Sequence, residues 1–259
     1  MDMTIIEKLS GFNHIKFNED DHTYMVGDIR LTSVTTLLKK FEPEKDWEEI
    51  AYKYSLKHGE TPSYWRLKWQ QEGIIGSEKG SMFHLYAENS IANKVYIPPF
   101  KRLLETQEKC SLVDINLERA LKKIMIMWDV FWLQAKGNLI PIRSEFIVGD
   151  LDYEVGGMID QLFWNVKMQE IQIWDWKTNK KISKANKYQS FLHPISHLDE
   201  CEFNKYSLQL AIYKYILEKN LGIKIGNCYI GYFYEGNMEY KVLKTREMKH
   251  EVEQILNAA

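Results

Sequence analysis

Two kinds of hydrophobic periodicity divide the chain near residue 136. Upstream, apolar and aromatic side chains recur at helical spacing in residues 44–72 and 101–136. The spacing is clearest in residues 111–135, at Leu117, Leu121, Ile124, Met127, Trp128 and Phe131. Downstream, short β-branched and aromatic segments at 140–148, 153–164 and 170–176 are separated by turn residues. We therefore predict helices in the first part and a meander of strands in the second.

Turn and capping signals place the remaining elements. Residues 22–26 and 29–31 flank Gly27-Asp28 and predict a hairpin, after which Thr32 or Ser33 caps a helix over 34–38. A helix is expected to begin between Ser77 and Gly80 and to end before two prolines at 98 and 99. Downstream we expect a helix at 205–219, strands at 227–234 and 238–243, and a short helix from about 246. With no repeat or linker, residues 1–259 are predicted to be one α/β domain: a mostly helical part with a short hairpin (1–135) and a catalytic core (136–259).

Composition narrows the class of protein. Hydrophobic residues make up 45% and aromatic residues 13% of the 259 residues, which is typical of a folded globular chain. A net charge of −2 excludes histone-like binding of nucleic acid but permits a local basic groove. The three cysteines, at 110, 201 and 228, form no C-x-x-C pair, which excludes zinc-ribbon and thioredoxin-like sites. Residues 1–8 resemble no targeting peptide, and no window approaches the ~18 apolar residues of a membrane span, so we expect a cytoplasmic protein without a membrane partner.

Two acids and a lysine stand near the ends of two predicted neighbouring strands. Asp160 follows Gly157-Met158-Ile159, and Asp175-Trp176-Lys177 closes the next apolar run. Residues two apart on a strand point to the same face, so Asp175 and Lys177 face one space, and a hairpin brings Asp160 close to them. Such carboxylates can hold Mg²⁺ or Mn²⁺ while the lysine orients water. The alternative is a surface hairpin with an ordinary ion pair.

Other candidate residues flank this pair of strands. His84 shares a helix face with Gly80 and Glu88 and offers a nitrogen ligand, or else it simply pairs with Glu88 on the surface. Glu145, on the first strand, is a further acid or a solvent-facing residue. Gln209 and Tyr213 form an i, i+4 pair that contacts DNA, supports the site or merely packs.

Two segments could contact a nucleic acid beyond the metal. Thr178, Lys180 and Lys181 begin a run to residue 188 that contains no acid and could neutralise phosphates, unless it is a solvated loop. The aromatic residues of 47–69 could stack unpaired bases or belong to the core. A second acid-x-lysine tripeptide, Glu247-Met248-Lys249, falls in the expected C-terminal helix, and we assign it no role.

Together these motifs resemble the PD-(D/E)xK nuclease superfamily, and within it the RecB-like exonuclease branch, which includes the mitochondrial genome maintenance exonuclease and phage-type exonucleases. The resemblance rests on the following segments in chain order: 22–24 with 31–38, Gly80 to His84, Glu145, Gly157 to Asp160, Asp175 to Thr178, 193–198, and Gln209 to Tyr213. It implies a restriction-endonuclease-like α/β core, a mixed central sheet flanked by helices, with a helical N-terminal elaboration.

The resemblance also implies a role for each residue. His84, Asp160, Asp175 and the Trp176 carbonyl would bind Mg²⁺ or Mn²⁺; Lys177 would activate water, with Glu145 as an accessory acid. Gln209 and Tyr213 would support substrate or catalytic geometry. Some relatives hold an iron–sulfur cluster on four cysteines, which three cysteines cannot supply.

The predicted activity is metal-dependent exonuclease cleavage of DNA, with single-stranded DNA carrying free ends as the partner, in replication, repair or recombination and in a phage-encoded setting. A restriction-like endonuclease and a non-catalytic single-strand-binding module on the same fold are the alternatives. The sequence does not indicate whether the protein has a protein partner.

Overall fold

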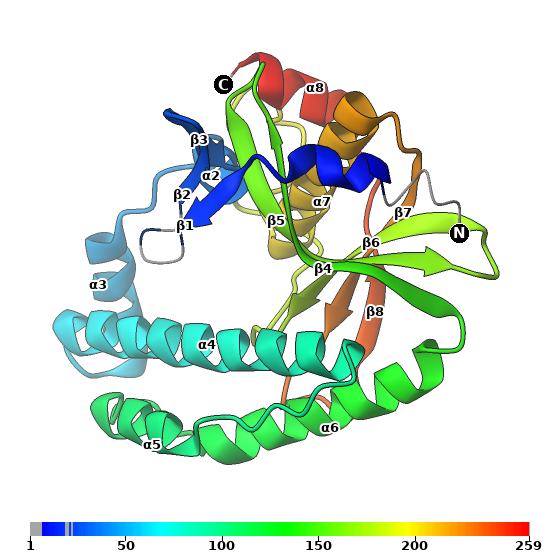
Figure 1. Ribbon diagram of the computed structural model, residues 1–259. Coiled ribbons are helices and arrows are strands. Elements are labelled where there is room, and N and C mark those ends of the chain that lie inside the picture. The colour runs from blue at the N-terminus through cyan, green and yellow to red at the C-terminus, as the bar shows by residue number, and fades with distance from the viewer. Residues whose placement is uncertain (1–6, 19–20, 22, 259) are drawn as a thin grey trace.

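A mixed sheet runs through the computed structural model, which describes residues 7–18, 21 and 23–258 (Figure 1). Within that part the sheet has 8 strands in the order β1-β2-β3-β5-β6-β7-β8, with β4 paired to β5 outside this path. The strands are β1 (Lys16–Asn18), β2 (Thr23–Val26), β3 (Ile29–Ser33), β4 (Leu139–Asp150), β5 (Val155–Asn165), β6 (Glu170–Lys177), β7 (Ile225–Tyr232) and β8 (Lys241–Lys244). The predicted meander β4–β5–β6 is confirmed, and both of its pairings are antiparallel.

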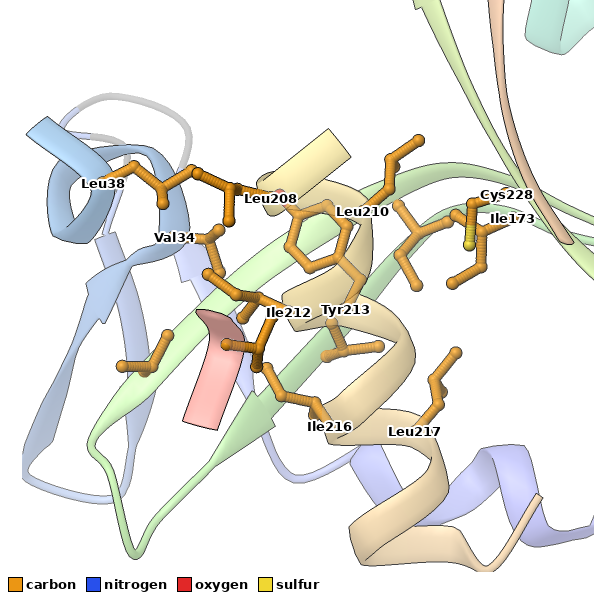
Figure 2. Packing of buried hydrophobic residues seen from close by; sticks show 14 of the residues in the cluster. Val34, Leu38, Ile173, Leu208, Leu210, Ile212, Tyr213, Ile216, Leu217 and Cys228 are labelled. Atoms are coloured by element: carbon orange, nitrogen blue, oxygen red, sulfur yellow. The ribbon is translucent and has the colours of Figure 1, made fainter. Parts of the chain in front are cut away.

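Helices cover both faces of this sheet (Figure 1). One layer contains α4 (Pro62–Ile91), α5 (Phe100–Lys109) and α6 (Leu117–Ala135), and the other contains α2 (Val34–Lys39), α7 (Glu202–Leu221) and α8 (Lys249–Asn257). A short 3-10 helix, η1 (Ser10–Phe12), precedes β1, and α3 (Trp47–His58) packs against α4. The apolar residues form two buried clusters, one under each layer, and Figure 2 shows the cluster around α7.

The sequence signals at the N-terminal hairpin are confirmed. Val26 pairs with Ile29 across the Gly27-Asp28 turn, where Gly27 has a φ of 57° that suits glycine. Ser33 caps α2 and accepts a hydrogen bond from the Thr36 amide at 3.1 Å. The predictions that concern residues 1–6 and His22 lie outside the described residues.

The predicted helix start between Ser77 and Gly80 is wrong. α4 begins 15 residues earlier, at Pro62, with the Thr61 side chain accepting a hydrogen bond from the Tyr64 amide. Glycines at 73, 76 and 80 lie inside this helix, and each costs it only about 1 kcal/mol relative to alanine. Ile75 and Phe83 pack in the buried cluster between the sheet and the layer of α4, α5 and α6, and this packing outweighs that cost.

Two further boundaries differ from the predictions. The helical stretches 44–72 and 101–136 are each interrupted, at Gly59 (φ 73°) and at residues 110–116, where Asn116 caps α6. The last helix begins at Lys249 rather than near 246, so Glu247 and Met248 precede it. Glu247 lies 3.4 Å from Lys214 of α7, and the second tripeptide lies between β8 and α8 and at the start of α8, not on a strand of the sheet.

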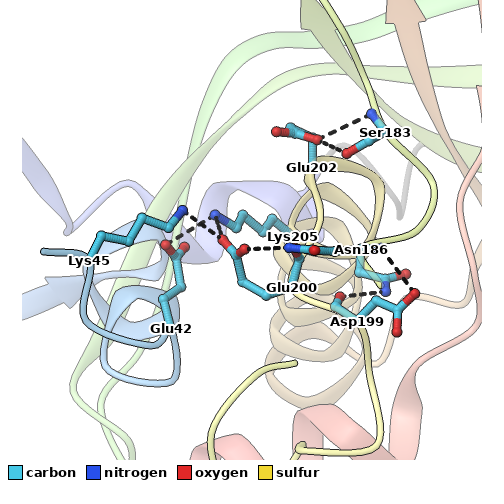
Figure 3. A network of polar contacts seen from close by, with 9 residues as sticks. Glu42, Lys45, Ser183, Asn186, Asp199, Glu200, Glu202 and Lys205 are labelled. Atoms are coloured by element: carbon cyan, nitrogen blue, oxygen red, sulfur yellow. Dashed lines mark hydrogen bonds and ion pairs between the residues drawn. The ribbon is translucent and has the colours of Figure 1, made fainter. Parts of the chain in front are cut away.

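A buried glutamate anchors the segment that follows β6 (Figure 3). The Glu200 carboxylate lies 3.2 Å from Lys45 Nζ and 2.5 Å from Lys205 Nζ, and Asn186 Nδ2 donates to it at 3.2 Å. Burial raises the pKa of Glu200, but its lysine partners outweigh that effect and lower the pKa overall. The network therefore ties residues 186–200 to α7 and to the segment before α3.

We expect Glu200→Gln to lower the free energy of unfolding by about 2 kcal/mol at pH 7, because the hydrogen bonds it loses involve charged groups. A carboxyl whose pKa is lowered by folding stabilises the protein above its unfolded pKa of about 4.3, and this contribution is lost as pH falls through the folded pKa. Thermal unfolding of both proteins should thus differ at pH 7 and converge in acid. An equal difference at every pH would contradict the electrostatic origin.

Candidate metal and catalytic site

The alternation of β6 directs Asp175 and Lys177 to the α7 side of the sheet. Ile171 and Ile173 pack in the α7-side cluster, whereas Trp174 and Trp176 pack on the α4–α6 side. Lys177 Nζ lies 2.5 Å from Asp175 Oδ2, and the Asp175 side chain is almost completely buried. The two residues therefore share one space, as their spacing predicts.

Asp160 lies where the β5–β6 ladder ends. The last recorded pair is Gln161 with Trp174, and beyond it Asp160 Oδ2 accepts the backbone N–H of Trp176 at 2.6 Å. This side-chain hydrogen bond replaces a ladder bond and fixes the carboxylate beside β6. Asp160 and Asp175 thus lie on neighbouring strands at the same point of the sheet.

His84 reaches the sheet from α4. Its Nε2 lies 3.0 Å from the Trp176 carbonyl oxygen and its Nδ1 lies 3.6 Å from Asp160 Oδ2. Gly80, His84 and Glu88 line one cavity of about 690 Å³ together with Glu145, which confirms that they share a helix face. The histidine is consequently an inner residue of the site.

Glu145 lies opposite Asp160 between the paired positions Ser144–Gln161 and Phe146–Ile159. Its φ of 46° places a non-glycine residue in the left-handed region, a conformation that costs about 1–3 kcal/mol and is concentrated at functional sites. The irregular backbone turns its carboxylate toward Asp160 and His84. The ligand atoms of these three residues all lie within 4.8 Å of one another.

This group fits a divalent cation. One imidazole nitrogen and two carboxylates form a mixed donor set that suits Mn²⁺ and Mg²⁺. Two ligand atoms at about 2.1 Å from one ion lie at most about 4.2 Å apart, so these three atoms, which lie within 4.8 Å of one another, need only a small side-chain movement to converge on one ion. The predicted ligand set is only partly assembled here, because Asp175 pairs with Lys177 instead of joining the three. The Trp176 carbonyl lies beside the imidazole.

Burial and crowded negative charge shift the titration of the site. Burial, followed by Asp160, Glu88 and Asp175, raises the pKa of Glu145 to about 8. Burial also raises the pKa of Asp175 to about 6, against the opposing effect of Lys177. Burial would lower the pKa of Lys177, but Asp175 and Asp160 outweigh it and raise the pKa. A region this rich in negative charge favours a bound cation.

The predicted pair Gln209 and Tyr213 supports the site from α7. Gln209 Nε2 donates to the Tyr213 hydroxyl at 3.2 Å, and the buried Tyr213 ring lies against Gly157 of β5 (Figure 2 shows Tyr213 in the packed core). A Cβ at Gly157 would come within 2.5 Å of Tyr213 Cε1. Glycine at 157 is therefore required for close approach of the helix, three residues before Asp160.

Gly157→Ala is expected to destabilise the protein by about 1–3 kcal/mol, the usual cost of overpacking a tight core. Gly73→Ala is the matched control, because nothing lies within 4 Å of the added Cβ and alanine favours a helix; it should stabilise by about 0.5–1 kcal/mol. Denaturant unfolding of the two variants measures both effects. Equal stability of the two variants would mean that the Tyr213 contact imposes no constraint.

The residues that follow Lys177 leave β6 beside α4. Thr178 is buried, and its Oγ1 would lie 3.6 Å from a Cβ at Gly80 of α4. Lys180 and Lys181 are exposed, and the Lys180 carbonyl accepts a hydrogen bond from the Tyr232 hydroxyl at 3.0 Å. Of these three residues, Thr178 lies next to the helix that carries His84. Lys180 and Lys181 face the solvent.

Two tyrosines of the site were given no role in the sequence analysis, although Tyr24 lies in a segment that contributed to the family resemblance. The Tyr206 ring centroid lies 4.8 Å from Lys177 Nζ, and Tyr24 lines the cavity of Glu145. Tyr206 precedes Gln209 by three positions and Tyr213 by seven, so helical spacing alone could have indicated it. Tyr24 stands on a strand distant in sequence, and no local signal connects it with Glu145.

A mixed sheet with an acid on one strand and acid-x-lysine on its antiparallel neighbour defines a nuclease of the restriction-endonuclease-like class. The sequence model of the PD-(D/E)XK nuclease superfamily matches residues 52–258, and the chain therefore belongs to this superfamily. No curated protein is similar enough to the chain to count as a relative. In the described residues, no helix is long and apolar enough to cross a membrane.

Two solved structures are similar over much of the chain. A candidate exonuclease from Eubacterium rectale matches with 14% identity and a TM-score of 0.40, over 71% of this chain and 63% of that one. The chain therefore spans less than two thirds of that relative. A protein called SSO0001 matches with 12% identity and a TM-score of 0.29, over 69% of this chain and 82% of that one.

Proposed function

We propose that the protein is a Mg²⁺- or Mn²⁺-dependent exonuclease that hydrolyses DNA from its ends and prefers single strands. The observation that carries the proposal is the pairing of Lys177 with Asp175 beside the ligand group His84, Glu145 and Asp160, in a member of a nuclease superfamily. The proposal treats residues 1–259 as one nuclease domain, because the family match extends across the boundary near residue 136.

Each residue has a part in the proposed reaction. The cation would be held by His84, Glu145 and Asp160, with the Trp176 carbonyl beside them. Asp175 would join these ligands when Lys177 releases it. The cation supplies positive charge for the phosphate oxygens and acidifies water. Lys177 orients the attacking water and stabilises the charge that develops on the phosphate. The Tyr206 ring limits where the ammonium group can lie.

Action at ends is supported by the sequence resemblance to the RecB-like branch. His84 on α4 and the hydrogen-bonded Gln209–Tyr213 pair on α7 are the features that go with that branch. The cellular setting that we propose, replication, repair or recombination of DNA in a phage-encoded system, follows from the same resemblance.

The test uses end-labelled linear single- and double-stranded DNA and a closed single-stranded circle, each with Mg²⁺, Mn²⁺ or a chelator. We expect the linear single strand to shorten only with a cation and the circle to stay intact. Cutting of the circle would contradict the requirement for an end and favour an endonuclease. Cation-independent binding without any cleavage would favour a binding module.

A further inference from the structure

A cluster of aromatic side chains joins α3 to the first half of α4. We call Trp47, Tyr54, His58, Trp65 and Trp69 the aromatic cluster. Its ring centroids are separated by 4.1 Å for Tyr54–His58, 4.6 Å for Tyr54–Trp65, 5.4 Å for Tyr54–Trp69 and 6.2 Å for Trp47–Trp69. The proposed reaction uses none of these residues.

The cluster is open to solvent on its outer side. Trp47 is 56% exposed and Tyr54 37%, and Trp65 and Trp69 are half-buried. Trp47, Leu67 and Trp69 line a hollow of about 570 Å³. If the rings served only to pack α3 against α4, the largest of them would be expected inside, as Trp128 is. Exposed planar rings around a hollow are suited to hold a flat ligand.

The cluster and the catalytic cavity lie on one helix. Trp69 precedes His84 by 15 positions on α4, about 22 Å at 1.5 Å per residue. The intervening positions on the same face, 73, 76 and 80, are glycines, and a Cβ at Gly73 or Gly76 would meet nothing within 4 Å. These three positions therefore place no side chain between the rings and the site, and Glu72 and Ser77 flank them.

The charges around the cluster are mixed and include cations that can contact a phosphate backbone. The acids Glu48 and Glu49 pair with Arg66 and Lys53. Lys68 Nζ lies 5.2 Å from the Trp65 ring centroid, and Lys68 lines a second hollow with Thr178 and Lys180 and with the acids Glu72, Asp114 and Glu235. Lys79, which lines the same hollow, pairs with Glu235. Cations therefore lie between the rings and β6, together with acids of which Glu235 is paired.

We propose that the aromatic cluster is a stacking platform for unpaired bases of a DNA strand whose end occupies the catalytic cavity. The proposal rests on the proposed function and names the part of the substrate that lies outside the cavity. Rings stack bases without regard to sequence, and neighbouring cations bind the backbone. The distance of about 22 Å corresponds to at most about six or seven nucleotides, the number at the 3.4 Å per phosphate of a B-form strand, because an unpaired strand can be more extended.

The experiment measures binding in chelator, where no cleavage takes place, with fluorescent oligothymidylates of three and twelve nucleotides and a blunt duplex. Trp69→Ala and Trp47→Ala should weaken binding of the twelve-nucleotide strand roughly 5- to 100-fold, the range for losing one stacked base. The trinucleotide cannot reach the rings and should bind equally to all variants, as should the duplex. With Mn²⁺, both variants should cleave the trinucleotide at the wild-type rate.

Control variants distinguish stacking of bases on the rings from docking of another partner in the same hollow. Trp69→Phe should restore most of the affinity that Trp69→Leu loses, and Leu67→Ala, which removes an exposed apolar side chain but no ring from the same hollow, should weaken binding far less than Trp69→Ala. Equal losses for Leu67→Ala and Trp69→Ala, or unchanged binding of the long strand in Trp47→Ala and Trp69→Ala, would overturn the proposal in favour of a protein-docking face. If Trp69→Ala does not fold, binding of the twelve-nucleotide strand by Trp47→Ala still tests the proposal. Failure of the wild type to cleave would instead contradict the proposed function alone.

Discussion

Lys177→Ala should reduce DNA cleavage about 10²- to 10³-fold, because it removes the group that stabilises charge developing on the phosphate. Asp175→Asn should have an effect of similar size, since Asp175 is both partner of the lysine and candidate ligand. Initial rates on a labelled single strand at saturating Mn²⁺ measure the loss. Binding of that strand in chelator should change far less than the rate.

The chain supplies its own control for this experiment. Lys249→Ala removes the lysine of the second acid-x-lysine tripeptide, at the exposed start of α8, and should leave the rate unchanged. Lys177→Ala also leaves Asp175 buried without its partner and lowers stability, so rates are compared well below the unfolding temperature of each variant. Wild-type rates in a folded Lys177→Ala protein would refute the catalytic assignment.

Loss of a metal ligand is the second large effect. Asp160→Asn keeps an oxygen that accepts the Trp176 amide but removes the charge, and His84→Ala removes the imidazole. Each should weaken Mn²⁺ binding by at least the roughly 10–100-fold that loss of an outer-shell partner causes. Calorimetric titration with Mn²⁺ measures this without DNA.

His197→Ala is the matched control for the metal experiment. His197 is exposed and lies 3.1 Å from Glu251, an imidazole–carboxylate pair remote from the cavity. We expect its variant to bind Mn²⁺ as the wild type does. A cation that binds equally well to Asp160→Asn would have to lie elsewhere, and the assignment of His84, Glu145 and Asp160 would fail.

The hydrophobic periodicity of the sequence predicted the strands that carry the site, because each strand packs against a buried cluster on both of its faces. Strands β4 to β6 alternate between two buried layers, and that alternation is visible in the residues from 140 to 177. Asp160, Asp175 and Lys177 could therefore be placed on adjacent strands in advance. The α/β fold class is confirmed; the chemical roles of these residues stay predictions.

Features that depend on contacts distant in sequence could not be predicted. Glu145 was predicted as a candidate acid, but the positive φ that brings it into the ligand group is indicated by nothing in its neighbours. The start of α4 was missed because residues 62–72 were assigned to the helical stretch 44–72, whereas contacts with α6 and the sheet hold residues 62–91 together as one helix. Pairing of Asp175 with Lys177, rather than with the three other ligands, likewise depends on the surroundings that α7 provides.

The position of His84 has a consequence for how the enzyme is held together. Glu145 and Asp160 belong to the sheet, but His84 belongs to α4, so the ligand group exists only while that helix layer is docked. A cation that binds only the docked form opposes release of the layer, by about 2.7 kcal/mol at a hundredfold excess over its dissociation constant. Binding of the metal and docking of α4 on the sheet are thus linked equilibria. Hydrogen exchange along α4 should therefore slow as Mn²⁺ is added.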